Sequence, residues 1–251
     1  MPRVTISAAQ LAREAELLGR RAAQGVGTLR RVGRPRPGAT PRTAVWRDDG
    51  VTLYRYDTST STHTPLLIVY ALVNRPDMVD LQADRSLVRA LIGHGFEVYL
   101  LDWGQPGPAD RMRGLDDYVN GYLDRAVDWL RGALGRSALP LMGICQGGTF
   151  ALCYAALQPD KVERLVTTVT PVDFHTPDDM LSHLVRHIDV DALVDAHGNL
   201  DGDVLNALFL SLKPFQLTQQ KYLRFVDTLD DPAATAMFLR MEQWIFDSPA
   251  L

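Results

Sequence analysis

Residues 139–150 read Leu-Pro-Leu-Met-Gly-Ile-Cys-Gln-Gly-Gly-Thr-Phe, so an apolar run ends at a cysteine bracketed by glycines. Gly143 and Gly147 lack the Cβ atoms that would collide with neighbouring backbone, which lets the chain turn sharply between a strand and a helix. Such a turn holds Cys145 out at the sheet edge and at a helix N-terminus, where partial positive charge favours a thiolate. The stretch predicts a nucleophile elbow that carries sulfur.

The second cysteine has a different setting. Cys153 lies within the predicted helix 149–157, among alanines and leucines and with no glycine bracket. This setting is typical of a small buried hydrophobe. Two cysteines in such unlike surroundings do not indicate a disulfide framework. The sequence shows no signal peptide and no long apolar span, so we expect a cytoplasmic protein without a transmembrane segment.

From Arg42 onward the chain alternates between strand and helix patterns. Residues 43–47 and 51–56 alternate in polarity about Asp48-Asp49-Gly50, which predicts an antiparallel hairpin. Short apolar runs, and the strand that leads into Cys145, are typical of buried parallel strands. The runs cover residues 66–70, 98–101 and 165–169, and helical patterns between them cover residues 85–92, 115–134 and 149–157. We expect an α/β fold whose mostly parallel sheet opens with a hairpin.

The pattern changes after Pro171, where helical segments follow one another without a convincing buried strand. These segments cover residues 178–185, 203–212, 219–229 and 232–246. An elbow enzyme needs an acid and a base on loops after later strands of the sheet, and those strands are missing. We therefore expect three parts. They are an N-terminal helix and basic linker (1–42), an incomplete α/β core (43–172) and a helical cap (173–251).

The N-terminal part is rich in arginine, with nine arginines against two glutamates in residues 1–42. Ser7 begins a plausible capping box for a helix that ends at about Arg21. Glycines from Gly25 onward break the periodicity, and residues 33–41 are typical of a linker. Because no aromatic residues are interleaved with the arginines, we expect a solvated linker rather than a nucleic-acid site. An arm that docks on a partner subunit is the alternative.

No metal site is predicted. His183 and His187 are four residues apart, but no glutamate completes a zinc-binding HExxH pattern. The aspartates between residues 189 and 203 lack the glycine and the glutamate of a calcium-binding loop. We expect these aspartates to cap helices and to form solvated turns.

Several segments together resemble one enzyme family. They are Gly143–Gly148, Tyr70–Pro76, Asp102–Gly104, Thr170–Phe174 and Phe238–Pro249. These residues resemble class III polyhydroxyalkanoate synthases, which form poly(3-hydroxybutyrate), in their catalytic subunit PhaC, and the similarity runs from about Val45 to Pro249. The resemblance implies an α/β-hydrolase fold, a cytoplasmic location at polyester granules and a PhaE-type second subunit. A homodimer is a further option.

The same resemblance implies a chemistry. Cys145 takes the acyl group from an (R)-3-hydroxyacyl-CoA as a covalent thioester, CoA leaves, and a 3-hydroxyl then lengthens the chain. No cofactor is expected beyond this CoA thioester. The backbone N–H of Gln146, directly after the nucleophile, and that of Val73, in the loop after strand 66–70, are the expected oxyanion donors.

The triad Asp and His of the family have no counterpart in this chain, because in the family they lie beyond the cap. Five of the six histidines do not fill the gap, since they precede the first core strand or lie in the cap segment. These are His63, His175, His183, His187 and His197. The chain is expected to be C-terminally truncated.

Two alternatives stay open. In the first alternative, the chain is an inactive truncated fragment or a non-catalytic assembly module. Apolar cap residues such as Phe215 and Trp244 are then partly exposed. The other alternative is a cysteine hydrolase similar to dienelactone hydrolase. That enzyme would need Asp and His on late strands and a compact fold without a cap.

Overall fold

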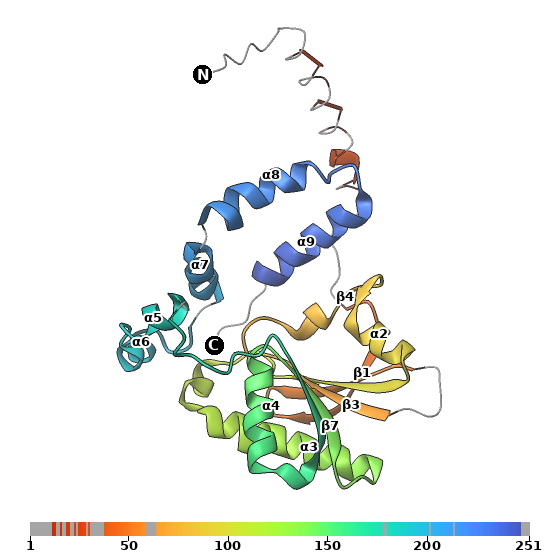
Figure 1. Ribbon diagram of the computed structural model, residues 1–251, viewed down its shortest axis with the longest axis vertical. Helices are drawn as coiled ribbons and strands as arrows, with labels where there is room; N and C mark the ends of the chain where they lie inside the picture. Colours follow the sequence, from red (N-terminus) through yellow and green to blue (C-terminus); the bar gives the residue numbers. More distant parts are fainter. Residues whose placement is uncertain are drawn as a thin grey trace. The chain divides into compact units, whose positions relative to one another are not determined.

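The computed structural model describes residues 38–58, 64–177, 180–200, 202–212 and 214–246, together with scattered positions between residues 12 and 30 (Figure 1). The chain divides into two compact units. The larger unit comprises Pro37–Leu208 and Trp244–Leu251, and the smaller comprises Met1–Arg36 and Phe209–Gln243. The division that the sequence indicates, at residues 42 and 172, stays a prediction. No helix in the described part of the chain is long and apolar enough to cross a bilayer.

The larger unit is built on a sheet in which the described residues form six strands, in the order β1-β2-β6-β3-β7-β8. β1 (Arg42–Asp48) and β2 (Val51–Tyr56) form the predicted antiparallel hairpin, and Asp49 takes a φ of 49° at its turn. The other four strands are parallel to one another. They are β6 (Phe96–Asp102), β3 (Thr64–Val69), β7 (Leu139–Ile144) and β8 (Val162–Thr168). The predicted α/β fold is confirmed.

Helices cover both faces of this sheet, which gives it two apolar cores (Figure 1). On one face, Leu67 and Val69 of β3 pack with α3 (Asp124–Leu134) and α4 (Gln146–Leu157). On the other face, Ile68 packs with α2 (Leu87–Gly93). Burial on both faces explains why the parallel strands are continuous apolar runs rather than alternating ones.

β8 lies at one edge of the sheet, and its side chains are mostly exposed, including Val166 at 51%. Among the described residues no strand follows β8 along the chain. The later segments are helical. They are α5 (Met180–Val185), α6 (Val190–His197), α7 (Gly202–Leu212), η5 (Gln216–Gln220), α8 (Lys221–Val226) and α9 (Pro232–Phe246).

The helix α6 was not predicted, and of the aspartates expected in caps and turns, Asp191 and Asp195 lie inside it. Asp189 is the N-cap of α6, and its carboxylate accepts a hydrogen bond from the Ala192 N–H at 3.0 Å. This bond satisfies one of the amides that a helix start leaves unpaired. The acidic residue is therefore a cap, as expected, and the helix that it opens is short.

In the smaller unit, Gly25 lies at a helical position beyond the predicted helix end at about Arg21, so the break expected there was wrong. Described positions 23, 25–28 and 30 are helical. A Cβ at Gly25 would come within 3.0 Å of the Leu229 side chain, so glycine allows a close approach there. That approach offsets the cost of about 1 kcal/mol for a glycine inside a helix. The capping box at Ser7 and residues 33–37 lie outside the described residues.

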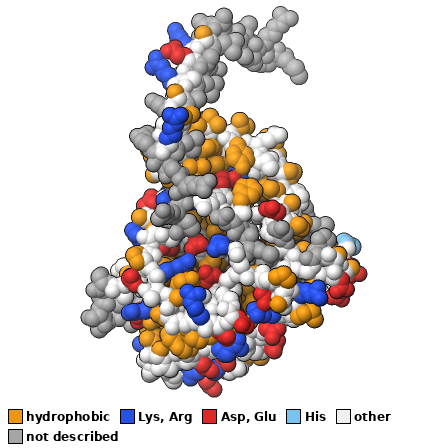
Figure 2. Space-filling model, turned by 180° about the vertical axis from the view of Figure 1, so that it is seen from behind, with side chains coloured by type: hydrophobic (Ala, Val, Ile, Leu, Met, Phe, Trp, Pro, Cys, Tyr) orange, Lys and Arg blue, Asp and Glu red, His pale blue; other side chains and the backbone are white. Residues whose placement is uncertain are grey.

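The smaller unit also joins α8 to α9. The rings of Phe225 and Phe238 stack with centroids 3.9 Å apart, and the Tyr222 hydroxyl donates to the Glu242 carboxylate at 2.8 Å. Figure 2 shows apolar side chains gathered over the surface of this unit. Among its exposed apolar residues, Leu223 is 66% exposed. Some of the apolar side chains expected to be exposed in residues 173–251 are therefore exposed.

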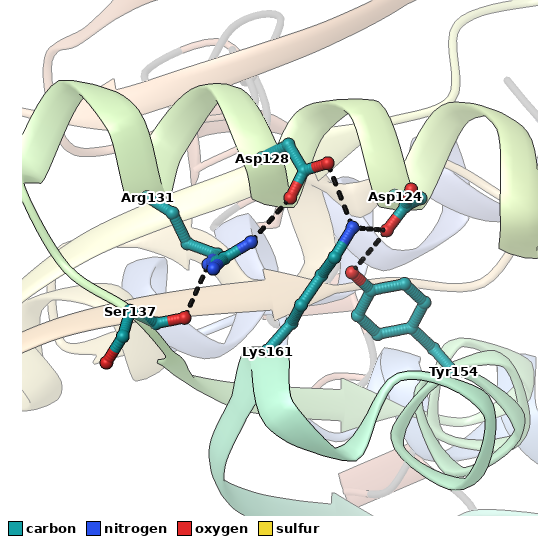
Figure 3. Close-up of polar contacts among 6 residues, drawn as sticks. All are labelled: Asp124, Asp128, Arg131, Ser137, Tyr154 and Lys161. Atoms are coloured by element: carbon teal, nitrogen blue, oxygen red, sulfur yellow. Dashed lines mark hydrogen bonds and ion pairs between the residues drawn. The ribbon is translucent and has the colours of Figure 1, made fainter.

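An ion-pair network fixes α4 against α3 (Figure 3). Lys161 Nζ lies 2.6 Å from the Asp124 carboxylate and 2.9 Å from that of Asp128, and the Tyr154 hydroxyl of α4 donates to Asp124 at 2.7 Å. Burial raises the pKa of Tyr154, and the bond to Asp124 raises it further, so the hydroxyl stays a donor. The helix that follows Cys145 is therefore held by this polar network as well as by the packing of its apolar face.

The same network affects the titration of Asp128. Burial alone would raise the pKa of Asp128, but hydrogen bonds from Lys161 and Arg131 outweigh burial and lower that pKa below its usual 3.8. Because the folded pKa is the lower one, the network contributes stability above the unfolded pKa. That contribution is lost as the pH falls through the folded pKa.

Lys161→Met is expected to lower the free energy of unfolding by about 1–2 kcal/mol at neutral pH, because two carboxylates lose a charged donor while the aliphatic stem remains. The difference from wild type should begin to shrink below about pH 4, where the carboxylate of the unfolded chain takes up a proton, and should be lost below the folded pKa of Asp128. Urea unfolding at several pH values measures this. The control is Arg164→Gln, at a side chain that is 81% exposed, which should change stability by less than about 0.5 kcal/mol. Equal losses in the two variants would contradict the prediction.

Candidate functional site

Cys145 lies at the turn between β7 and α4 in a conformation that side chains rarely adopt, with φ 54° and ψ −130°. A strained residue of this kind costs about 1–3 kcal/mol and persists only where its surroundings hold it. Here the Cys145 N–H donates to the Thr168 carbonyl of β8 at 3.0 Å, and the Cys145 carbonyl accepts from the Gly148 N–H at 2.9 Å. The sharp strand-to-helix turn predicted from the sequence is confirmed.

Three glycines around Cys145 are required because neighbouring atoms come very close. A Cβ built at Gly143 would lie less than 3.0 Å from the backbone of the first turn of α4. At Gly147 it would collide with backbone at the end of β3, and at Gly148 with the side chain of Thr170. The pattern Gly-x-Cys-x-Gly-Gly is therefore a steric requirement of the turn.

The two cysteines differ in accessibility as expected. Cys145 is exposed, whereas Cys153 is partly buried and packs against the core between α4 and the sheet. Cys145 is the N-cap of α4, and its side chain forms no capping hydrogen bond. Its thiol lies at the carboxyl end of the parallel strands, where open α/β sheets bind their ligands.

The loop after β3 lies beside the first residue of α4. The Leu72 N–H donates to the side-chain oxygen of Gln146 at 3.1 Å, and Asn74 takes a φ of 66°. Val73 lies between these two fixed positions. Gln146 begins α4, so its own N–H has no partner within the helix. The structure thus brings the segment with Val73 next to Gln146, and their role as oxyanion donors stays a prediction.

Two tryptophans bind backbone carbonyls of the same loop. Trp103 Nε1 donates to the Tyr70 carbonyl at 2.8 Å, and Trp244 Nε1 donates to the Arg75 carbonyl at 2.6 Å. Trp244 is partly buried against the core on the α2 face. Trp244 was expected among the partly exposed apolar residues, and its bond to Arg75 was not predicted. No local pattern marks the bond, because it joins residues 169 positions apart.

Tyr70 lies within electrostatic reach of Cys145. Burial raises the pKa of Tyr70, and negative charge at Cys145 and Asp77 raises it further. Burial also raises the pKa of Asp77, against the opposing effect of Arg42, whose guanidinium lies 3.2 Å from the carboxylate. Tyr70 is therefore a neutral hydroxyl near the thiol.

A cavity of about 240 Å³ opens next to the loop after β3. Leu72, Trp103, Tyr118 and Leu200 are among the residues that line it. The Trp103 ring also lies edge-on to Tyr118, with centroids 5.6 Å apart. Trp103 thus both anchors the loop and shapes the space beside it.

Among the described residues no histidine forms a hydrogen bond or ion pair with Cys145. His183 Nε2 lies 3.1 Å from the Pro177 carbonyl, and His175 is exposed. His63 lies outside the described residues. In the described part of the chain, no three His, Cys, Asp or Glu side chains gather as a metal ion requires.

A family model described as the alpha/beta hydrolase fold matches residues 64–244. The chain belongs to the alpha/beta hydrolase fold family. It is also similar to curated proteins named Poly(3-hydroxyalkanoate) polymerase subunit PhaC. Identity is 55% over 234 residues with that of Allochromatium vinosum, 56% over 215 with that of Thiocystis violacea and 50% over 220 with that of Synechocystis sp.. The resemblance noted from the sequence is confirmed.

These alignments cover 92%, 84% and 84% of this chain and 66%, 61% and 58% of the three relatives, in the same order. The chain therefore spans less than two thirds of the length of the relatives that it matches. The region that the family model matches includes the elbow, the loop after β3 and α9 up to Trp244.

Gly147→Ala is expected to destabilise the protein by about 3 kcal/mol, because the new Cβ would collide with backbone that cannot rotate away. The matched control is Gly132→Ala in α3, where no atom lies within 4 Å of the added Cβ. That change should stabilise by about 0.5–1 kcal/mol. Chemical unfolding of both variants measures the effect. If the two alanine variants unfold alike, the close-contact account is wrong.

Proposed function

We propose that Cys145 is the acyl-accepting nucleophile of a polymerase that transfers (R)-3-hydroxyacyl groups from CoA to a growing polyhydroxyalkanoate. The observation that carries the proposal is the exposed thiol on a strained turn at the N-terminus of α4. The names of the similar curated proteins support the substrate class.

The first step exchanges one thioester for another. The Cys145 thiolate attacks the carbonyl carbon of the acyl-CoA, and the carbonyl oxygen takes the negative charge. When the carbonyl re-forms, the bond between carbon and the CoA sulfur breaks, and CoA leaves as a thiolate that takes up a proton. Little free energy is lost in this exchange, so the bound acyl group stays reactive.

The oxyanion formed in this step needs donors that are already in place. We assign the backbone N–H groups of Gln146 and Val73 to this role. The bond from the Leu72 N–H to the Gln146 side chain holds the two segments together, which supports the assignment. Donors fixed before the reaction stabilise the transition state without the cost of reorganising.

The second step lengthens the polymer. The 3-hydroxyl oxygen of one acyl group attacks the Cys145 thioester, a carbon–oxygen ester bond forms, and the sulfur leaves as a thiolate. The hydroxyl proton goes to a general base, for which we assign no residue among those described. The first step needs no such base once the thiol is ionised, so it is testable on this chain alone.

We propose further that no cofactor takes part, since thioester exchange uses only the sulfur and hydrogen-bond donors. A PhaE-type second subunit and the polyester granule surface in the cytoplasm are the proposed partners. Exposed apolar residues of the smaller unit, among them Phe215 at 61% and Leu223 at 66%, support binding at an apolar surface.

Incubation with 3-hydroxybutyryl-CoA at alkaline pH, where unassisted cysteines ionise, should add one acyl group to the wild-type chain. Cys145→Ala should abolish the addition, because the attacking sulfur is gone. Cys153→Ala is the matched control and should label like wild type, because that thiol is partly buried on α4. Intact-protein and peptide mass spectrometry measure the labelling.

Two outcomes would refute the proposal. One is labelling that persists in Cys145→Ala. The other is a Cys145 that iodoacetamide alkylates readily but that no 3-hydroxyacyl-CoA acylates, since the thiol would then be reactive without being an acyl acceptor.

A further inference from the structure

A second cavity adjoins the one beside the loop after β3, and the two share part of their walls. The first, of about 240 Å³, is lined by Leu72, Trp103 and Tyr118, and we term it the inner chamber. The second, of about 470 Å³, is more open and lies between the proline-containing loop after β6 and the end of α6. We term it the outer chamber. Arg111 and Asn199 line both chambers, so they form one cleft.

The walls of this cleft are bonded to each other. The Asn199 side-chain amide, just after α6, donates to the Gly107 carbonyl at 2.7 Å. The Gly107 N–H in turn donates to the Asp110 carboxylate of η2 (Pro108–Met112) at 2.6 Å. The cleft is therefore a built feature of the larger unit, with one wall from the sheet loops and one from the segment after α6.

Two arginines line the cleft, and their surroundings differ. The Arg113 guanidinium is used within the protein, because it pairs with Asp110 at 2.9 Å and Asp49 at 3.2 Å and lies over the Tyr122 ring. Arg111 is exposed and has no carboxylate partner among the described residues. Only Arg111 of this pair has a charge available for a ligand.

We propose that this cleft binds the phosphorylated carrier of the acyl thioester and that Arg111 binds one of its phosphates. The inference rests on the proposed function. The inner chamber shares Leu72 with the loop bonded to Gln146, so it lies beside the elbow and suits the acyl end and the pantetheine arm. A CoA thioester is larger than that chamber, so its nucleotide extends into the outer chamber.

Arg111 suits a phosphate for chemical reasons. Its planar guanidinium offers parallel N–H donors that match two phosphate oxygens, and charge-assisted bonds of this kind are among the stronger ones in proteins. Asp195 also lines the outer chamber and forms no ion pair with Arg111 in the described part of the chain. This carboxylate opposes an anion, so its removal should strengthen binding.

The test uses desulfo-CoA, which keeps the phosphates but lacks the thiol and cannot react with Cys145. Calorimetric titration of the purified chain compares the binding of desulfo-CoA with that of desulfo-pantetheine, which has no phosphate. Arg111→Gln should weaken desulfo-CoA binding about tenfold and leave desulfo-pantetheine binding unchanged. Asp195→Asn should tighten desulfo-CoA binding. Added salt should weaken binding to wild type more than to Arg111→Gln.

Arg136→Gln is the matched control for loss of one positive charge. Arg136 precedes β7, at the opposite end of the parallel strands from Cys145. The variant should therefore bind both probes like wild type. Unfolding curves for each variant establish that the fold is retained.

The inference is overturned if desulfo-CoA does not bind to the wild-type chain. It is also overturned if desulfo-CoA binds to Arg111→Gln as tightly as to wild type. Acylation of Cys145 by a phosphate-free 3-hydroxyacyl-pantetheine separates this failure from failure of the proposed function. If this thioester acylates Cys145 and Arg111→Gln binds desulfo-CoA normally, only the phosphate site is wrong. If neither thioester acylates Cys145, the proposed function fails, while the desulfo-CoA titration still decides the phosphate site.

Discussion

The rest of the site depends on the close packing of the β7–α4 turn against the end of β3. At Gly147, the space that a Cβ would need is filled by backbone of Val69 and Tyr70. Backbone held in a paired strand cannot move aside as the end of a flexible side chain can. The start of α4 is therefore fixed at the sheet edge, Cys145 is forced to a positive φ, and the loop after Tyr70 begins beside the thiol.

That loop has no regular structure, yet side chains from three distant parts of the chain bind its backbone. Trp103 binds the Tyr70 carbonyl, Gln146 binds the Leu72 N–H, and Trp244 binds the Arg75 carbonyl. Each bond satisfies a backbone group that no helix or strand partner would satisfy. An irregular segment is thereby held as firmly as a strand, which is what a site for a developing negative charge requires.

The elbow, the hairpin and the parallel strands could be predicted because their causes are local. Glycine spacing around Cys145, a turn signal at Asp49-Gly50 and short apolar runs each occupy a few neighbouring residues. The helical conformation at Gly25 could not be predicted, because this glycine is tolerated through its contact with Leu229, far along the chain. The anchor at Trp244 was missed for the same reason. The cap at Asp189 was recognised, but a helix as short as α6 gives too little periodicity to be found.

The separation of these partners along the chain bears on when the reactive geometry arises. The bond between Leu72 and Gln146 joins residues 74 positions apart, and that between Trp244 and Arg75 joins residues 169 apart. Contacts this distant form only after the entropy of closing long loops has been overcome. Before β3 and β7 pair, nothing holds Cys145 at positive φ. During synthesis and early folding the protein therefore contains an ordinary, relaxed cysteine, and the strained thiol exists only once the sheet is assembled.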